Sequence, residues 1–111
     1  MGFNRWLGIE PQADGGGVVL DTRPDHLVAP ETVHFAVLAT LAEVAASLAV
    51  AAPVVPTTVA LSLLSRARPG RLVGRGRLLR RGRRLAFAEG EVLQGDRLVA
   101  KASVTFALLE G

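Results

Sequence analysis

The chain has 111 residues, half of them hydrophobic, a formal net charge of +3 and no cysteine. This length predicts a single domain over residues 1–111. The lack of cysteine excludes disulfides, thiolate metal sites and cysteine nucleophiles, and it is typical of a cytoplasmic protein. No basic head followed by an apolar run opens the chain, so we expect no signal peptide.

The first predicted strand covers residues 17–22 and follows a flexible turn of three glycines. Residues 23–30 form a predicted loop because two prolines punctuate them, and His26 in this loop is expected to be solvated. Thr32 is the predicted N-cap of the next element, and Glu31 is interpreted as a first-turn residue favoured by the helix dipole.

A helix is predicted from about Val33 to Ala51, ended by Pro53. It is apolar almost all round, which indicates that other elements enclose it. A membrane span of this length would place Glu43 near its centre, at a cost of about 3 kcal/mol that alanine does little to offset. We therefore expect a buried helix of a soluble domain and no membrane partner.

Glu43 is the only charged side chain in residues 32–65. Burying an unpaired carboxylate costs about several kcal/mol or raises its pKa, and proteins tolerate this mainly where the group is paired or does chemistry. Spacings of three and four place Ala36, Thr40, Glu43 and Ser47 on one helix face. The hydroxyls of Thr40 and Ser47 either assist the carboxylate or bond back to the preceding helical turn.

Beyond the helix the apolar period changes to two, which predicts strands at residues 57–65, 71–81, 84–94 and 97–109. Folding the hairpins about Gly82 and Asp96 pairs Arg75 with Glu89 and Glu91 with Lys101 on a solvent-facing side. One helix packed on one curled antiparallel sheet of about five strands is an α+β fold. Such a sheet leaves part of the helix uncovered, so a second subunit is expected to cover it.

Nine of the 13 basic residues fall in residues 66–84, and all nine are arginine. Such a segment either holds phosphate groups bidentately or forms a solvated strand face. It has no interleaved aromatic residues, recognition helix or metal-binding finger, so we expect no nucleic-acid partner.

Residues 24–48 resemble the central signature of the hotdog-fold acyl-CoA thioesterases, and the closest branch is the PaaI-type or 4-hydroxybenzoyl-CoA thioesterase-like group. The segments at 57–76, 81–87 and 98–106 are similar to the later strands and turns of this family. The resemblance covers about residues 16–109 and implies the hotdog fold, in which a curled antiparallel sheet wraps one long central helix.

The resemblance also implies an acyl-CoA thioesterase whose helix carboxylate acts as a nucleophile or as the base that activates water. Glu43, nine residues after His34, occupies the position of that carboxylate, and Ser47 stands where relatives carry an assisting hydroxyl. A backbone N–H that maps to Phe35–Ala36, on the neighbouring subunit, would polarise the thioester carbonyl, and His34 would add a donor.

The implied substrate-binding residues are Phe35, Ala36, Thr40, Arg81, Arg83 and Arg84. The three arginines would hold the phosphates of CoA. The resemblance implies no metal, no cofactor other than the CoA thioester as substrate, and a homodimer or homotetramer.

Two alternatives stay open. Phe35-Ala36 stands where the family has Gly-Gly, Glu31 replaces its preceding glycine, and Val28 replaces an amide side chain. A degenerate hotdog protein that binds CoA esters without cleaving them, or serves as an assembly module, fits these replacements. A hydratase or dehydratase is less favoured, because that chemistry uses a histidine at a longer spacing from the carboxylate, where Ala29 stands.

Overall fold

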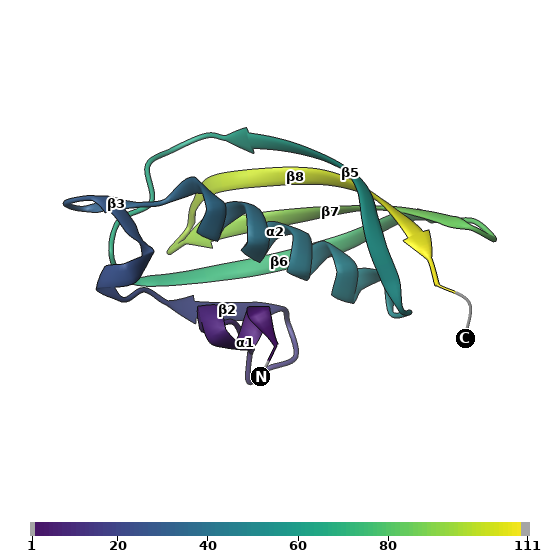
Figure 1. The fold of residues 1–111 in the computed structure, drawn as a ribbon, viewed down its shortest axis with the longest axis horizontal. Coiled ribbons are helices and arrows are strands. Elements are labelled where there is room, and N and C mark those ends of the chain that lie inside the picture. Colours follow the sequence, from purple (N-terminus) through teal and green to yellow (C-terminus); the bar gives the residue numbers. More distant parts are fainter. Residues whose placement is uncertain (1, 110–111) are drawn as a thin grey trace.

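The computed structural model describes residues 2–109 and shows one long helix lying across a curled antiparallel sheet (Figure 1). Its elements are α1 (Phe3–Leu7), β1 (Glu10–Pro11), β2 (Val18–Asp21), a 3₁₀ turn (Pro24–His26), β3 (Leu27–Ala29), β4 (Thr32–Val33), α2 (Phe35–Val50), β5 (Val54–Leu63), β6 (Arg71–Arg81), β7 (Leu85–Gln94) and β8 (Arg97–Leu108). The prediction of one helix wrapped by one sheet is confirmed.

The main sheet has six strands in the order β1-β2-β6-β7-β8-β5, and every neighbouring pair is antiparallel. The sequence predicted about five strands, and the additional one is the two-residue β1 that pairs with the start of β2. A separate two-stranded sheet, β3 with β4, leads into α2. These short strands carry too few residues to show a period-two pattern, so the sequence did not predict them.

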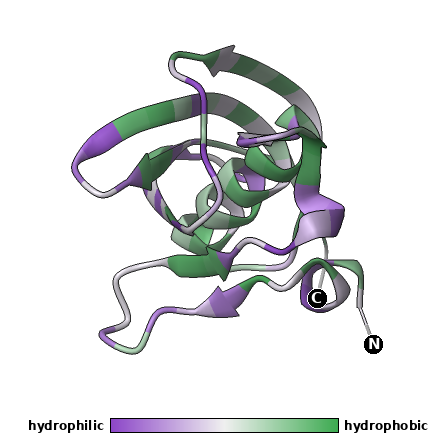
Figure 2. Cartoon of the chain, turned by 90° about the vertical axis from the view of Figure 1, so that its left-hand side faces the viewer, coloured by the Kyte–Doolittle hydropathy of each residue, from purple (hydrophilic) through white to green (hydrophobic). Residues whose placement is uncertain are grey.

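Small residues bring α2 close to the sheet. Gly76 and Gly90 face the helix, and a Cβ at either would collide with the backbone carbonyl of Ala45 or Ala42 respectively. Ala42 and Ala46 are completely buried against this surface. The sheet curls around the mostly hydrophobic helix when viewed along the long axis (Figure 2). Within residues 2–109, no helix is both long enough and apolar enough to cross a membrane.

The entry to α2 differs from the prediction. Thr32 is not the N-cap, because Thr32–Val33 forms β4 and the helix is capped by His34, two residues after Thr32. Glu31 does not lie in the first helical turn: it sits in the β3–β4 turn with a φ of 61°. A residue with positive φ after proline is typical of a type II turn, where glycine is preferred. Glu31 thus occupies a backbone position at which glycine would be less strained.

The predicted register of the β6–β7 hairpin is wrong by two residues. Arg75 pairs with Glu91 and Arg77 with Glu89, because the turn is centred between Arg83 and Arg84 rather than at Gly82. A bulge between Leu78 and Arg80 lengthens β6 relative to β7. Across the β7–β8 hairpin the predicted pair of Glu91 with Lys101 is confirmed.

Candidate active site

His34 shapes the N-terminus of α2. Its Nδ1 accepts a hydrogen bond of 3.0 Å from the Ala36 N–H, and its own backbone N–H donates to the His26 carbonyl at 2.8 Å. A neutral imidazole that accepts at Nδ1 carries its proton on Nε2, so Nε2–H is left as a donor. The imidazole also stacks on the Phe35 ring, with centroids 5.0 Å apart.

One backbone donor stays available at this helix start. The Ala36 N–H donates to His34, and the Val37 N–H donates to the His34 carbonyl at 3.0 Å. Phe35 is the first helical residue, and its N–H has no acceptor within residues 2–109. Of the two backbone positions implied for the oxyanion donor, Phe35 is therefore the one whose N–H can reach a substrate.

An open cavity of about 590 Å³ lies beside this helix start. Apolar side chains form most of its wall, chiefly Val28, Phe35, Leu38, Leu63 and Leu64. Its polar side chains are Thr32, His34, Ser65 and Arg66. The cavity thus joins the start of α2 to the segment that leaves β5, two parts of the chain about thirty residues apart in sequence.

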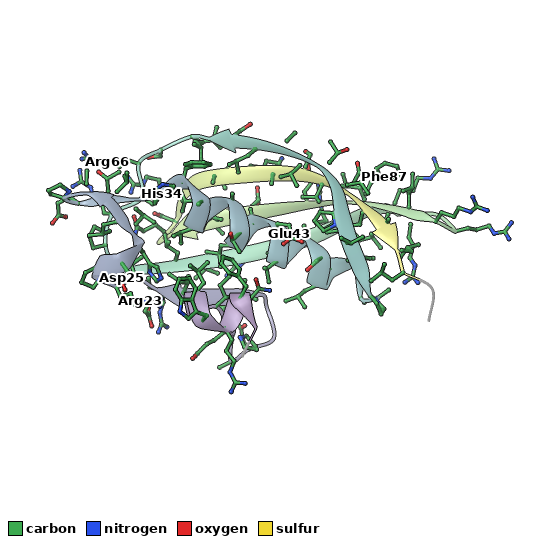
Figure 3. All side chains as sticks on the ribbon, viewed as in Figure 1. Arg23, Asp25, His34, Glu43, Arg66 and Phe87 are labelled. Carbon is green, nitrogen blue, oxygen red and sulfur yellow. The ribbon has the colours of Figure 1, made fainter. Side chains whose placement is uncertain are left out.

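Glu43 lies in the middle of α2, on the face turned away from the sheet (Figure 3). Its side chain is half-buried and has no hydrogen bond or ion pair in the described part of the chain. Desolvation by burial raises the pKa of Glu43. The prediction of a lone carboxylate in an apolar environment matches this geometry.

A second half-buried glutamate, on the outer face of the sheet, shows the opposite behaviour. Glu89 accepts from Arg77 at 2.6 Å and from Lys101 at 3.3 Å. These hydrogen bonds lower the pKa of Glu89. Glu43 differs because it is half-buried and no cation among residues 2–109 pairs with it. This environment is expected of a working carboxylate rather than of a structural ion pair.

The neighbouring hydroxyls are engaged with their own helix. Thr40 Oγ1 donates to the Ala36 carbonyl and Ser47 Oγ donates to the Val44 carbonyl, both at 2.8 Å. Of the two readings that the sequence left open, this is the bond to the preceding turn. Each hydroxyl oxygen can still accept a hydrogen bond, and Thr40 and Ser47 are neighbours of Glu43 in the helical repeat.

His34 and Glu43 of one chain cannot share a substrate carbonyl. Their separation of nine positions corresponds to about 13 Å along the helix axis. The predicted site residues thus form two groups on α2, one of His34, Phe35 and Ala36 at its start and one of Thr40, Glu43 and Ser47 along its open face.

The arginines expected to hold CoA phosphates lie at the far end of the molecule. The β6–β7 hairpin and β3 are at opposite ends of the ribbon (Figure 1). Arg81 Nη1 donates to the Val50 carbonyl at the C-terminal end of α2, at 3.4 Å. Arg83 and Arg84 are exposed, without a carboxylate partner in residues 2–109. The structure does not bring these arginines to His34 within one chain.

The prediction that His26 is solvated is wrong, because its side chain is buried, with 2% of its surface exposed. Its Nδ1 accepts from the Arg23 N–H at 3.1 Å, and its Nε2–H donates to the Leu7 carbonyl at 2.8 Å. Desolvation lowers the pKa of His26. The ring ties the N-terminal segment to the loop that supports His34, a role that depends on α1 packing and leaves no local sequence signal.

Comparison with known proteins identifies the family. The model of a family described as the acyl-CoA thioesterase N-terminal domain matches residues 23–107. The chain belongs to this acyl-CoA thioesterase family. No curated protein sequence is significantly similar to the chain.

Solved structures agree with this family and with the hotdog fold. A mutant of the phenylacetic acid degradation protein PaaI from Thermus thermophilus is 28% identical, with a TM-score of 0.85 over 96% of this chain and 98% of that one. A conserved protein from Pseudomonas aeruginosa is 27% identical, with a TM-score of 0.86 over 98% and 94%. A phenylacetic acid degradation-related protein from Ralstonia eutropha is 28% identical, with a TM-score of 0.79 over 95% and 88%. The hotdog thioesterase fold and the PaaI-like resemblance are therefore confirmed, and the family supports acyl-CoA thioesterase activity in general terms.

Proposed function

We propose that this protein hydrolyses acyl-CoA thioesters through the carboxylate of Glu43. The observation that carries the proposal is a half-buried glutamate, unpaired within residues 2–109, on the open face of the central helix. The family implies the substrate class, and the environment of Glu43 supplies the reactive group.

Two chemical routes remain open for the carboxylate. As a nucleophile it attacks the thioester carbonyl, CoA leaves as the thiol, and water hydrolyses the resulting anhydride. As a base it takes a proton from water, which attacks the carbonyl directly. Both routes yield a carboxylic acid and CoA, and both develop negative charge on the carbonyl oxygen. The Phe35 N–H and His34 Nε2–H are the proposed donors to that oxygen.

The two groups on α2 meet only if a second copy supplies one of them. β5 offers the surface for this assembly, because it is a sheet edge of ten residues with exposed apolar side chains at Val55 and Val59. The opposite edge, β1, has two residues and includes Pro11, so it is a poor template for pairing. We propose a homodimer through β5, which can pair further into a homotetramer, with Glu43 of one copy facing the helix start of the other.

The remaining predicted residues have supporting roles in this proposal. Ser47 would assist Glu43, and Thr40 and Ala36 would line the substrate path along the open helix face. Arg81, Arg83 and Arg84 would hold CoA phosphates, because their guanidinium groups pair with no carboxylate of the described residues 2–109. A cytoplasmic location stays a prediction from the lack of cysteine.

Binding of CoA esters without cleavage is the second candidate. It is favoured by the Ala36 N–H, which already donates to His34, and by the Phe35 ring at the rim of the cavity. Both features reduce the room and the donors available to an oxyanion.

Replacing Glu43 with glutamine tests the two candidates. Across a panel of acyl- and aryl-CoAs, we expect Glu43→Gln to lower kcat/KM by about 10²–10⁴-fold, since a positioned acid or base contributes this much.

The wild-type rate should rise with pH through a pKa above the ordinary glutamate range, because burial raises the pKa of Glu43 and only the ionised form reacts. Glu91→Gln is the matched control, since Glu91 is also half-buried and lies on the outer face of the sheet. CoA binding without turnover, equal in wild type and Glu43→Gln, would instead establish the binding protein.

A further inference from the structure

Among residues 2–109, the side chains that line the cavity beside the start of α2 carry one full positive charge and no negative charge. Arg66 is the only lysine or arginine among its lining residues, and none of them is acidic. The Arg66 side chain has no hydrogen bond or ion pair in residues 2–109. An apolar wall with one unpaired guanidinium at its rim suits a ligand that is apolar along its length and anionic at one end.

The backbone around Arg66 is fixed, so the guanidinium emerges from a defined point. The Arg66 carbonyl accepts from Arg97 Nη2 at 3.1 Å, and the adjacent Ala67 carbonyl accepts from the Val33 N–H at 2.9 Å. The Leu64 N–H donates to the Val99 carbonyl, also at 2.9 Å. These bonds tie the segment after β5 to both β8 and β4, which frames the cavity from two sides.

We propose that Arg66 makes this cavity selective for acyl groups that end in a carboxylate. The inference rests on the proposed thioesterase function and names its substrate class. The thioester would lie at the Phe35 N–H, the carbon chain would run along Phe35, Leu63 and Leu64, and the distal carboxylate would accept hydrogen bonds from Arg66. His34 and Arg66 lie at the same end of the molecule, as this arrangement requires (Figure 3).

The phosphates of CoA are the other anions that Arg66 could bind. The cavity wall favours the acyl group, because it is mainly apolar and offers few hydrogen-bonding groups for an adenine nucleotide. The volume of about 590 Å³ lies in the range of sites that enclose a small organic group. The two sources can be separated with pantetheine esters, which lack the phosphates of CoA.

The test compares esters that differ only at the far end of the acyl chain. We would measure kcat/KM for succinyl-, adipyl- and suberyl-CoA against butyryl-, hexanoyl- and octanoyl-CoA. We expect wild type to favour the carboxylate-ended member of at least one pair by about tenfold to a hundredfold, the value of a charge-assisted hydrogen bond. Arg66→Gln should abolish that ratio, and Arg66→Lys should retain part of it because lysine keeps the charge but not the planar fork.

Arg68→Gln is the matched control, because it removes the same charge from the same loop and Arg68 does not line the cavity. Its ratio should equal that of wild type. A wild type that treats the paired esters alike would overturn the proposal. So would an Arg66→Gln loss that is equal for both members of each pair and absent with pantetheine esters, since that pattern assigns Arg66 to the CoA phosphates.

Failure of the thioesterase function itself gives a different result. If no ester is hydrolysed, calorimetric binding of the same CoA esters still measures the ratio within each pair. Tighter binding of the carboxylate-ended esters, lost in Arg66→Gln and kept in Arg68→Gln, would support the role of Arg66 in a protein without turnover. Equal binding within the pairs would refute it.

Discussion

The two long faces of α2 differ in the size and polarity of their side chains. The face toward the sheet consists of small apolar residues such as Ala42 and Ala46, both completely buried, and glycines of the sheet bring the backbones together. The open face carries Thr40, Glu43 and Ser47, all half-buried. One face of the helix is tightly packed, so side-chain size determines which residues fit there. The other face is loosely covered, so its polar groups can bind a ligand or contact a second copy.

The face of α2 toward the sheet has no room for a larger side chain at Gly90. Gly90→Val should prevent stable folding, because even a Cβ at this position would collide with the Ala42 carbonyl and the helix cannot move away without opening the core. We expect a loss of at least about 3 kcal/mol in the free energy of unfolding, measured by urea denaturation.

Ser103→Val provides the control for this change. Ser103 lies on β8, is exposed and points to the outer face of the sheet, so the same valine side chain should change stability by less than about 0.5 kcal/mol. If both variants lost a similar amount of free energy of unfolding, the close approach of α2 to Gly90 would not be the reason that this position requires glycine.

A proline at the start of α2 tests whether the Phe35 N–H is the donor to the substrate oxygen. Phe35→Pro deletes the proposed donor N–H at the first helical position, where proline is tolerated, and His34 already has the extended conformation that a following proline requires. We expect a loss of about 10²–10³ in kcat, the value of one oxyanion donor. Phe35→Ala removes the ring and keeps the N–H, so it should retain the larger part of kcat.

Mixing two inactive chains then decides where the site lies. A heterodimer of Glu43→Gln with Phe35→Pro contains one site with both changes and one with neither, provided that each site draws on both copies. Purified through two tags, it should regain about half of the wild-type activity. A heterodimer that stays inactive, or a wild type that is monomeric in light scattering, would refute the shared site.

The sequence predicts the long elements well because their signals are local. The bounds of β6 and the existence of β7 and β8 follow from period-two alternation and hairpin glycines, and the end of α2 follows from Pro53. Glu43 stands out because it is the only charge in a long apolar run. These features can be predicted from local sequence patterns, without knowing which segments contact one another in the fold.

Features that depend on meeting segments could not be predicted. His34 replaces Thr32 as the cap because β3 pairs with β4, and the β6–β7 register depends on a bulge between Leu78 and Arg80. The cavity is lined by residues from two segments, 28–38 and 63–67, that are distant in sequence. No local sequence pattern therefore indicates that Arg66 is a site residue. The roles of Glu43, His34 and the hairpin arginines stay predictions until the variants are measured.

The carboxyl group of Glu43 should also change the stability of the fold with pH. Burial raises the pKa of Glu43 above its unfolded value of 4.5, so the folded state binds the proton more tightly than the unfolded chain. Folding is therefore opposed at neutral pH, where Glu43 is ionised, and this penalty disappears as the pH falls below 4.5.

Glu43→Gln should raise the free energy of unfolding modestly at pH 7 and leave it nearly unchanged in acid. Glu89→Gln should instead lower the free energy of unfolding at pH 7, because the interactions of this carboxylate with Arg77 and Lys101 are lost. Urea midpoints of the three proteins at both pH values measure this. A loss of stability in Glu43→Gln at pH 7 would show that the second copy pairs this carboxylate with a cation, and the open face would then be a structural interface rather than a site held ready for a substrate.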